Sequence, residues 1–329
     1  MTTPVLICDD SSFAQKQMAR ALPRDWDVSL AFAADGAQGL ELIRAGKGDI
    51  LFLDLNMPVL DGYQVLEAIR REDLNTLVIV VSGDVQPEAR ARVLRLGALD
   101  FIKKPITEDA VGTILDRYGI RGQPGQLRGE LEFQIDELDR YREIANVAMG
   151  RAGDLLARLL GAFVKLPVPK VRMIEGCDLR MALQDIEASE TVSAVCQGFI
   201  GAGIAGEALL SFTESSFSDI AALMHHEGEI DDAAQLELLM DVASILIGAC
   251  LKGIANQLDI NFSQGHPVVL GRHVNIAELL RDNASRWRRT LAIEIGYRIE
   301  DRNINCDLML LFSEDSLDEL RERASFLDH

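Results

Sequence analysis

One helix-like run, residues 137–149 (ELDRYREIANVAM), holds residues that could do chemistry. Asp139, Glu143 and Asn146 are spaced at i, i+4 and i+7, so a helix would place an acid, an acid and an amide along one face. Apolar residues between them predict that the opposite side is buried. Polar residues on a helix more often form a solvated face. A Glu and an Asn at fixed separation can also orient water or stabilise an anion, which suits chemistry on phosphate.

The same spacing returns later in the chain. Between Asn146 and Pro169 lie 22 residues (169 − 146 − 1), and between Ser244 and Pro267 lie 22 again (267 − 244 − 1). The second set is offset by 98 (244 − 146) and consists of Glu237, Asp241, Ser244 and Pro267. The pattern of an acid or Ser, then Glu, Asn and Pro at these intervals resembles the signature of the CheC/CheX/FliY family. Members of that family are phosphatases of phosphorylated response regulators.

The resemblance implies roles for individual residues. Glu143 would pair with a lysine of the bound receiver, and Asn146 would hold the attacking water. In the second set, Asp241 is one methylene shorter than Glu, and Ser244 lacks a planar amide with donor and acceptor together. We therefore expect Glu143 and Asn146 to be catalytic and the set with Asp241 and Ser244 to be degenerate, kept for folding.

A second group of polar residues follows apolar strand-like runs near the start of the chain: Asp9, Asp10, Asp54, Ser82 and Lys104. Three converging carboxylates repel one another, and a hard divalent cation such as Mg²⁺ removes that repulsion. A hydroxyl and a lysine opposite them would hold the oxygens of a phosphoryl group bound to one carboxylate.

This group resembles the site of a two-component receiver domain, on the motifs DD at 9–10, DLNMPVLDG at 54–62, SGD at 82–84 and KKP at 103–105. The resemblance implies that Asp54 is the phosphoacceptor and that a sensor histidine kinase is a partner. It assigns the other roles as follows: Mg²⁺ ligands Asp9, Asp10, Asp54 and the Asn56 carbonyl; phosphoryl contacts Ser82 and Lys104; switching aromatic Phe101. It also implies a cis Lys104–Pro105 bond.

Strands and helices are expected to alternate over this first domain, residues 1–118. Such alternation predicts a flavodoxin-like, doubly wound α/β fold, in which ligands bind at the carboxyl ends of the strands. The expected strands are 5–8, 28–33, 50–54, 78–82 and 100–103, and the expected helices are 13–22, 37–45, 63–71, 87–96 and 108–118.

Residues 119–129 (GIRGQPGQLRG) are rich in glycine and predict a linker. Residues 130–329 predict an α+β domain without regular alternation. The expected helices are 131–149, 152–163, 217–224, 233–254, 276–283 and 317–326, and the expected strands include 192–199, 208–212, 291–297 and 307–312.

Two alignments within this second domain predict an internal duplication. Residues 209–220 (LLSFTESSFSDI) align with residues 309–320 (MLLFSEDSLDEL) at an offset of 100, and the phosphatase-like runs repeat at 98. Offsets that agree within two residues indicate one duplicated unit of about a hundred residues and a pseudo-twofold domain.

Composition limits the classes of partner. The net charge of −19 and pI near 4.7 argue against nucleic acid and against an anionic membrane surface. The five cysteines show no short pair that would indicate zinc or a disulfide framework. The start of the chain does not read as a signal peptide, and the apolar run 242–254 is short and contains Lys252. We expect a cytoplasmic protein.

These patterns together predict a chemotaxis-type response regulator whose output domain removes phosphate from an aspartyl-phosphate receiver. A separate receiver protein is the favoured substrate, with the chain's own receiver as the other candidate. Two non-enzymatic alternatives are a docking module switched by phosphorylation and a phosphate sink that uses Asp54. Homo-oligomer formation is left open.

Overall fold

The computed structural model describes residues 2–120, 135–175, 192–213, 215–226, 228, 230–274, 289–302 and 304–328. The expected helix 276–283 and most of the expected linker, residues 121–129, lie outside these residues. Contacts between Cα atoms divide the chain into two compact units, Met1–Glu143 and Ile144–His329. The division falls inside one long helix.

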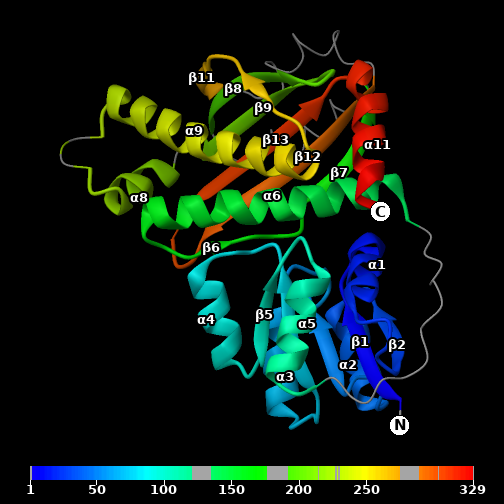
Figure 1. Ribbon diagram of the computed structural model, residues 1–329. Coiled ribbons are helices and arrows are strands. Elements are labelled where there is room, and N and C mark those ends of the chain that lie inside the picture. The colour runs from blue at the N-terminus through cyan, green and yellow to red at the C-terminus, as the bar shows by residue number, and fades with distance from the viewer. Residues whose placement is uncertain are drawn as a thin grey trace. The chain divides into compact units, whose positions relative to one another are not determined.

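The first unit contains a parallel sheet of five strands in the order β2-β1-β3-β4-β5, with helices on both of its faces (Figure 1). This is the predicted flavodoxin-like α/β fold. The strands are β1 (Thr3–Cys8), β2 (Val28–Ala33), β3 (Ile50–Leu53), β4 (Leu77–Ser82) and β5 (Asp100–Lys103). The helices are α1 (Ser12–Ala21), α2 (Gly36–Arg44), α3 (Gly62–Arg71), α4 (Pro87–Arg95) and α5 (Glu108–Arg117).

Alternate residues of the strands enter two separate cores. In β1, Leu6 and Cys8 join the core that contains the apolar faces of α2 and α3, whereas Val5 and Ile7 join the core that contains those of α1 and α5. The inner strands β1, β3 and β4 are thus largely buried on both faces, which explains their nearly continuous apolar runs in the sequence. The strand order reverses between β1 and β3, and open sheets of this kind bind ligands at such a point.

The second unit is built on one antiparallel sheet in the order β10-β8-β9-β13-β12-β6, to which β11 adds beside β8 and β7 beside β12. Its strands are β6 (Val164–Lys165), β7 (Lys170–Glu175), β8 (Val192–Gly201), β9 (Ile204–Thr213), β10 (Ser263–Gln264), β11 (Val268–Val274), β12 (Arg289–Ile299) and β13 (Asn305–Phe312). Its helices are α6 (Glu137–Leu160), α8 (Ser216–Leu223), α9 (Asp232–Gln257) and α11 (Leu317–Ser325), with 3₁₀ turns η1 (Glu314–Ser316) and η2 (Phe326–Asp328).

Helices α6 and α9 lie side by side across the sheet (Figure 1). A Cβ atom on Gly253 of α9 would lie 2.8 Å from the Cα of Ala148 of α6, so the two backbones are in close approach there. The Gln257 side chain also donates to the carbonyl of Ile144 at 2.9 Å. This packing requires a glycine at the crossing point.

Helix α6 corrects the prediction of two helices, 131–149 and 152–163. The helix runs unbroken through Gly150 to Leu160. A glycine in a helix costs about 1 kcal/mol relative to Ala, and the burial of one apolar side of α6, including Ile144, Val147 and Leu156, outweighs that cost.

Strand pairing in the second unit has the symmetry expected of two copies of one unit. Leu209 of β9 pairs with Met309 of β13, which is its own equivalent at an offset of 100 (309 − 209). Lys170 pairs with Glu294, and Val268 pairs with Cys196. These two pairs are equivalent at an offset of 98, because Val268 is the equivalent of Lys170 (268 − 170) and Glu294 is the equivalent of Cys196 (294 − 196). The short strands of each half therefore pair with the long hairpin of the other half.

The two offsets differ because the second hairpin has a longer turn. Strands β8 and β9 are joined by two residues, Ala202 and Gly203, both at positive φ. In the second hairpin, residues 300–303 separate Ile299 from Ile304, which are the equivalents of Gly201 and Ile204 at offsets of 98 and 100. The two extra residues account for the change from 98 to 100.

Two buried hydroxyls link the halves in the same reciprocal way. Ser216 Oγ accepts a hydrogen bond from the Asn305 amide at 3.1 Å, and Ser316 Oγ accepts one from the Ala205 amide at 2.8 Å. Both pairs are related by an offset of 100. The two equivalent serines, Ser216 and Ser316, therefore have a structural role.

Helix α9 is long and apolar enough to cross a membrane by length and composition, so the prediction that this run is too short was wrong. The sequence estimate failed because it counted only residues 242–254, whereas the helix spans Asp232–Gln257. In the structure, 61% of its most apolar window is buried, and Leu246, Ile247 and Leu251 are among the fully buried side chains. The helix has the place of a core helix in the second unit.

Candidate functional site

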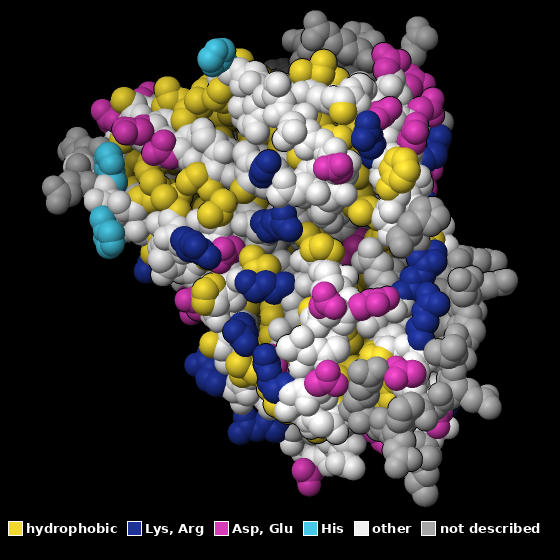
Figure 2. All heavy atoms as spheres, in the orientation of Figure 1, with side chains coloured by type: hydrophobic (Ala, Val, Ile, Leu, Met, Phe, Trp, Pro, Cys, Tyr) yellow, Lys and Arg dark blue, Asp and Glu magenta, His cyan; other side chains and the backbone are white. Residues whose placement is uncertain are grey.

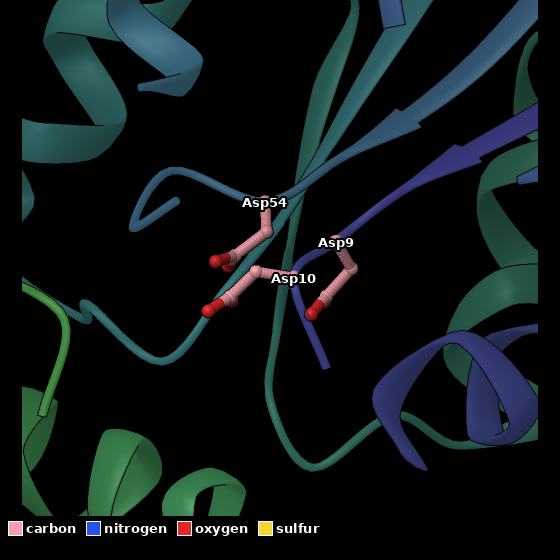
Figure 3. A group of neighbouring side chains, drawn as sticks. All are labelled: Asp9, Asp10 and Asp54. Atoms are coloured by element: carbon pink, nitrogen blue, oxygen red, sulfur yellow. The ribbon is translucent and has the colours of Figure 1, made fainter. Parts of the chain in front are cut away.

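Three carboxylates meet at the carboxyl end of the parallel sheet (Figure 3). Asp9 and Asp10 follow β1, and Asp54 follows the neighbouring strand β3, so the fold brings the two segments together. One ligand oxygen from each lies within 4.8 Å of the others, a grouping that could hold a metal ion. Gly62 supports this geometry, because a Cβ there would lie 2.3 Å from the Asp54 carbonyl oxygen.

Lys104 is the cation at the centre of these acids. Its buried Nζ lies 2.7 Å from Asp9 Oδ2 and 3.5 Å from Asp54 Oδ1. The Lys104–Pro105 peptide bond is cis, as predicted. Burial lowers the pKa of Lys104, but the neighbouring Asp54 and Asp9 outweigh that effect and hold the pKa well above its usual value. The lysine therefore carries a positive charge.

The surroundings of Asp9 and Asp10 disfavour the ionised form of these carboxyl groups. Burial raises the pKa of Asp9 well above its ordinary value, although Lys104 acts in the other direction. Burial and the charge of Asp54 raise the pKa of Asp10 to about 7. Because carboxylates outnumber the lysine here, a divalent cation with oxygen ligands would fit the donor set.

The other residues predicted for this site have these positions. Ser82 ends β4 and is fully buried, and its hydroxyl accepts from the Asp84 amide at 3.1 Å. The Asn56 amide donates to Asp54 Oδ2 at 3.1 Å. Phe101 in β5 is 7% exposed and belongs to the core that α2 and α3 cover. The ring is thus already buried.

The beginning of α6 belongs to the first unit and contributes two further acids. Glu143 reaches Lys104 with both oxygens at 3.2 Å. Asp139 Oδ2 accepts hydrogen bonds from Ser12 Oγ at 2.8 Å and from the Phe13 amide at 2.9 Å. The spacing in sequence had marked Asp139 and Glu143 as one face of a helix, but it gave no signal for Ser12 and Phe13, which lie more than 120 positions away.

The second set of motif residues has a different environment. Asp139, Glu143 and Asn146 are buried, whereas Glu237, Asp241 and Ser244 on α9 are exposed. Ser244 Oγ donates to the Met240 carbonyl of its own helix at 2.8 Å. The hydroxyl is thus bonded to its own backbone rather than directed at another group.

Charge is unevenly distributed on the surface of this acidic chain. Lys and Arg side chains gather over α4 (Figure 2), whose sequence includes Arg90, Arg92 and Arg95. Arg90 and Arg117 lie 3.6 and 2.8 Å from the carboxylate of Asp100. The net negative charge therefore does not extend to this face.

Residues 5–116 match the family model of the response regulator receiver domain. A protein-glutamate methylesterase/protein-glutamine glutaminase of Geobacter sulfurreducens is 31% identical over 151 residues, which cover 45% of this chain and 40% of that protein. The probable transcriptional regulatory protein NarL of Mycobacterium tuberculosis is 36% identical over 158 residues, which cover 47% of this chain and 72% of that protein. The chain spans less than half the length of the methylesterase relative.

Among solved structures, FliY of Thermotoga maritima aligns with 60% of this chain and 100% of its own, at 19% identity and a TM-score of 0.45.

Proposed function

Because this chain belongs to the response regulators and carries their receiver domain, we propose that Asp54 is its phosphoacceptor and that α6 carries a phosphatase site for aspartyl phosphate. Glu143 and Asn146 are the proposed catalytic residues. A sensor histidine kinase is the proposed phosphate donor, and the cytoplasm the proposed location. We assign Mg²⁺ to Asp9, Asp10 and Asp54, with the Asn56 carbonyl as a further ligand.

One observation carries the phosphatase proposal. Glu143 contacts Lys104 at 3.2 Å, and Lys104 Nζ also lies 3.5 Å from Asp54 Oδ1. A carboxylate from α6 thus pairs with the lysine expected to bind the phosphoryl group. This is the pairing that the motif on α6 implied for a phosphatase and its receiver.

The chemistry requires little from the protein beyond positioning. Asn146, three residues beyond Glu143 on the same face of α6, would orient a water through its amide group. The water oxygen attacks phosphorus, the bond from phosphorus to the Asp54 carboxylate oxygen breaks, and inorganic phosphate leaves with the water's protons. Ser82 and Lys104 would bind the phosphoryl oxygens, and Mg²⁺ would supply further neutralisation of their charge.

The sequence favoured a separate receiver as the substrate. The pairing of Glu143 with Lys104 of the same chain instead supports the chain's own receiver as a substrate. A tethered substrate is present at high effective concentration, which favours reaction within one chain.

In the test, the full chain is phosphorylated with acetyl phosphate in the presence of Mg²⁺. The acetyl phosphate is then removed, and the loss of the phosphoryl group from Asp54 is measured over time. We expect Asn146→Ala to slow the decay about a hundredfold, since a misplaced water loses the positioning effect. Ser244→Ala is the matched control at the equivalent position of α9 and should decay like wild type. Equal rates for wild type and Asn146→Ala would support a docking module or a phosphate sink instead.

A further inference from the structure

We propose that Asp139 is a positioning residue, which docks the beginning of α6 on the N-terminus of α1 and so holds Glu143 beside Lys104 of the phosphorylation site. This inference rests on the proposed phosphatase function. It assigns a role to the first acid of the motif on α6, for which the resemblance gave no chemistry.

The contact with Asp139 involves hydrogen-bond donors at the N-terminus of α1. The first amide groups of a helix have no partner within the helix. Ser11 Oγ accepts from the Ala14 amide at 3.1 Å, and Asp139 Oδ2 accepts from the Phe13 amide at 2.9 Å. The Ser12 hydroxyl donates to the same Asp139 oxygen at 2.8 Å. Two different segments thus cap one helix end, and a carboxylate there also interacts favourably with the helix dipole.

Burial and a contact with Arg142 also restrict the position of the Asp139 carboxylate. Its side chain is only 9% exposed, and Arg142, one turn along α6, lies 3.4 Å from its other oxygen. A hydrogen bond from a neutral donor to a buried charged acceptor is stronger than one between neutral groups. The contact is therefore more than an incidental surface interaction.

Two contacts hold the first turns of α6, up to Glu143, within the first unit. Asp139 binds Ser12 at the start of α1, two residues after Asp10, and Glu143 binds Lys104, which follows β5. These segments carry the acids and the lysine of the site. Because Asp139 and Glu143 are four residues apart on one face of the helix, the contact of Asp139 with α1 keeps Glu143 within reach of Lys104.

The first part of the test asks whether the docking exists in solution. Hydrogen exchange is measured in the full chain on peptides that contain the start of α1. We expect Asp139→Ala to speed exchange of the Phe13 amide about tenfold, because that amide loses its acceptor. Glu237→Ala, at the equivalent position of α9, should leave it unchanged. Unchanged exchange in Asp139→Ala would overturn the docking.

The second part asks whether the docking aligns the reaction. In the acetyl phosphate experiment, Asp139→Ala should slow loss of the Asp54 phosphoryl group about tenfold. Ser12→Ala should also slow it, and the double variant should be no slower than Asp139→Ala alone, because both changes remove one contact. A role confined to folding of α6 would give no such coupling with Ser12.

The outcomes separate this inference from the proposed function. If Asn146→Ala slows the decay but Asp139→Ala decays like wild type, the positioning role fails while the phosphatase stands. If neither variant slows the decay, both fail, and the exchange of Phe13 reports on the docking alone. Additive effects of Ser12→Ala and Asp139→Ala would also overturn the positioning role.

Discussion

At the scale of single residues, the site of the first unit depends on acids that are costly to bury. The pKa of Asp10 is raised from 3.8 to about 7 by burial and by the charge of Asp54. The folded state therefore binds this proton more tightly than the unfolded chain, and the stability that the proton provides is lost as the pH rises to about 7. Above that pH the charge of Asp10 opposes folding until a cation is bound.

This predicts opposite effects of one substitution with and without metal. At pH 8 in EDTA, Asp10→Asn should raise the melting temperature by about 2–5 °C, because one repelling charge is removed. With Mg²⁺ added, wild type should gain melting temperature and the variant should gain much less. Thermal unfolding measures both. Asp49→Asn, which removes an exposed charge in the same unit, is the control; an equal Mg²⁺ response in Asp10→Asn would contradict the ligand assignment.

Sequence reasoning placed the acids of this site well, because parallel strands bring their carboxyl ends to one edge. Asp9, Asp54 and Lys104 each follow a strand, and the structure brings them together. The contact of Asp139 with Ser12 could not be predicted, since no local periodicity relates residues that belong to different helices and are 127 positions apart.

At the scale of elements, the long helices of the second unit show where local rules fail. The prediction ended one helix at residue 149 and began another at 152, yet α6 continues through Gly150 because tertiary burial decides helix length. Strands β6, β7, β10 and β11 were not predicted. Strands β6 and β10 have only two residues each, which is too short for a periodic pattern. All four strands pair with a hairpin of the other half, and such long-range pairing leaves little local pattern in the sequence.

The crossing of α6 and α9 gives a prediction with an internal control. A Cβ at Gly253 would lie 2.8 Å from the Ala148 Cα, and backbone cannot move aside easily. Gly253→Ala should therefore lower the free energy of unfolding by roughly 1–3 kcal/mol. Gly248→Ala lies in the same helix with open space around the new methyl and should be neutral or stabilising by up to about 1 kcal/mol. Urea unfolding compares them, and equal losses in both would contradict the close approach.

At the scale of the whole molecule, the repeat offsets of 98 and 100 are explained by the strand pairing. The offset between equivalent residues changes from 98 to 100 because the second hairpin has a longer turn. The short strands of each half pair with the hairpin of the other half. The sequence revealed the two offsets, whereas the exchange of strands appears only in three dimensions. Such exchange explains why an unused copy such as the one with Asp241 and Ser244 would be retained for folding.

The central claim is that α6 dephosphorylates Asp54 of its own chain. The most direct measurement is the decay of the phosphorylated full chain, wild type beside Asn146→Ala, over an about 100-fold range of protein concentration. We predict that wild type decays rapidly with a rate constant independent of concentration, and that Asn146→Ala decays slowly throughout. A wild-type rate constant that rises in proportion to concentration would assign the reaction to separate chains. Identical decay of the two proteins at every concentration would contradict the phosphatase itself.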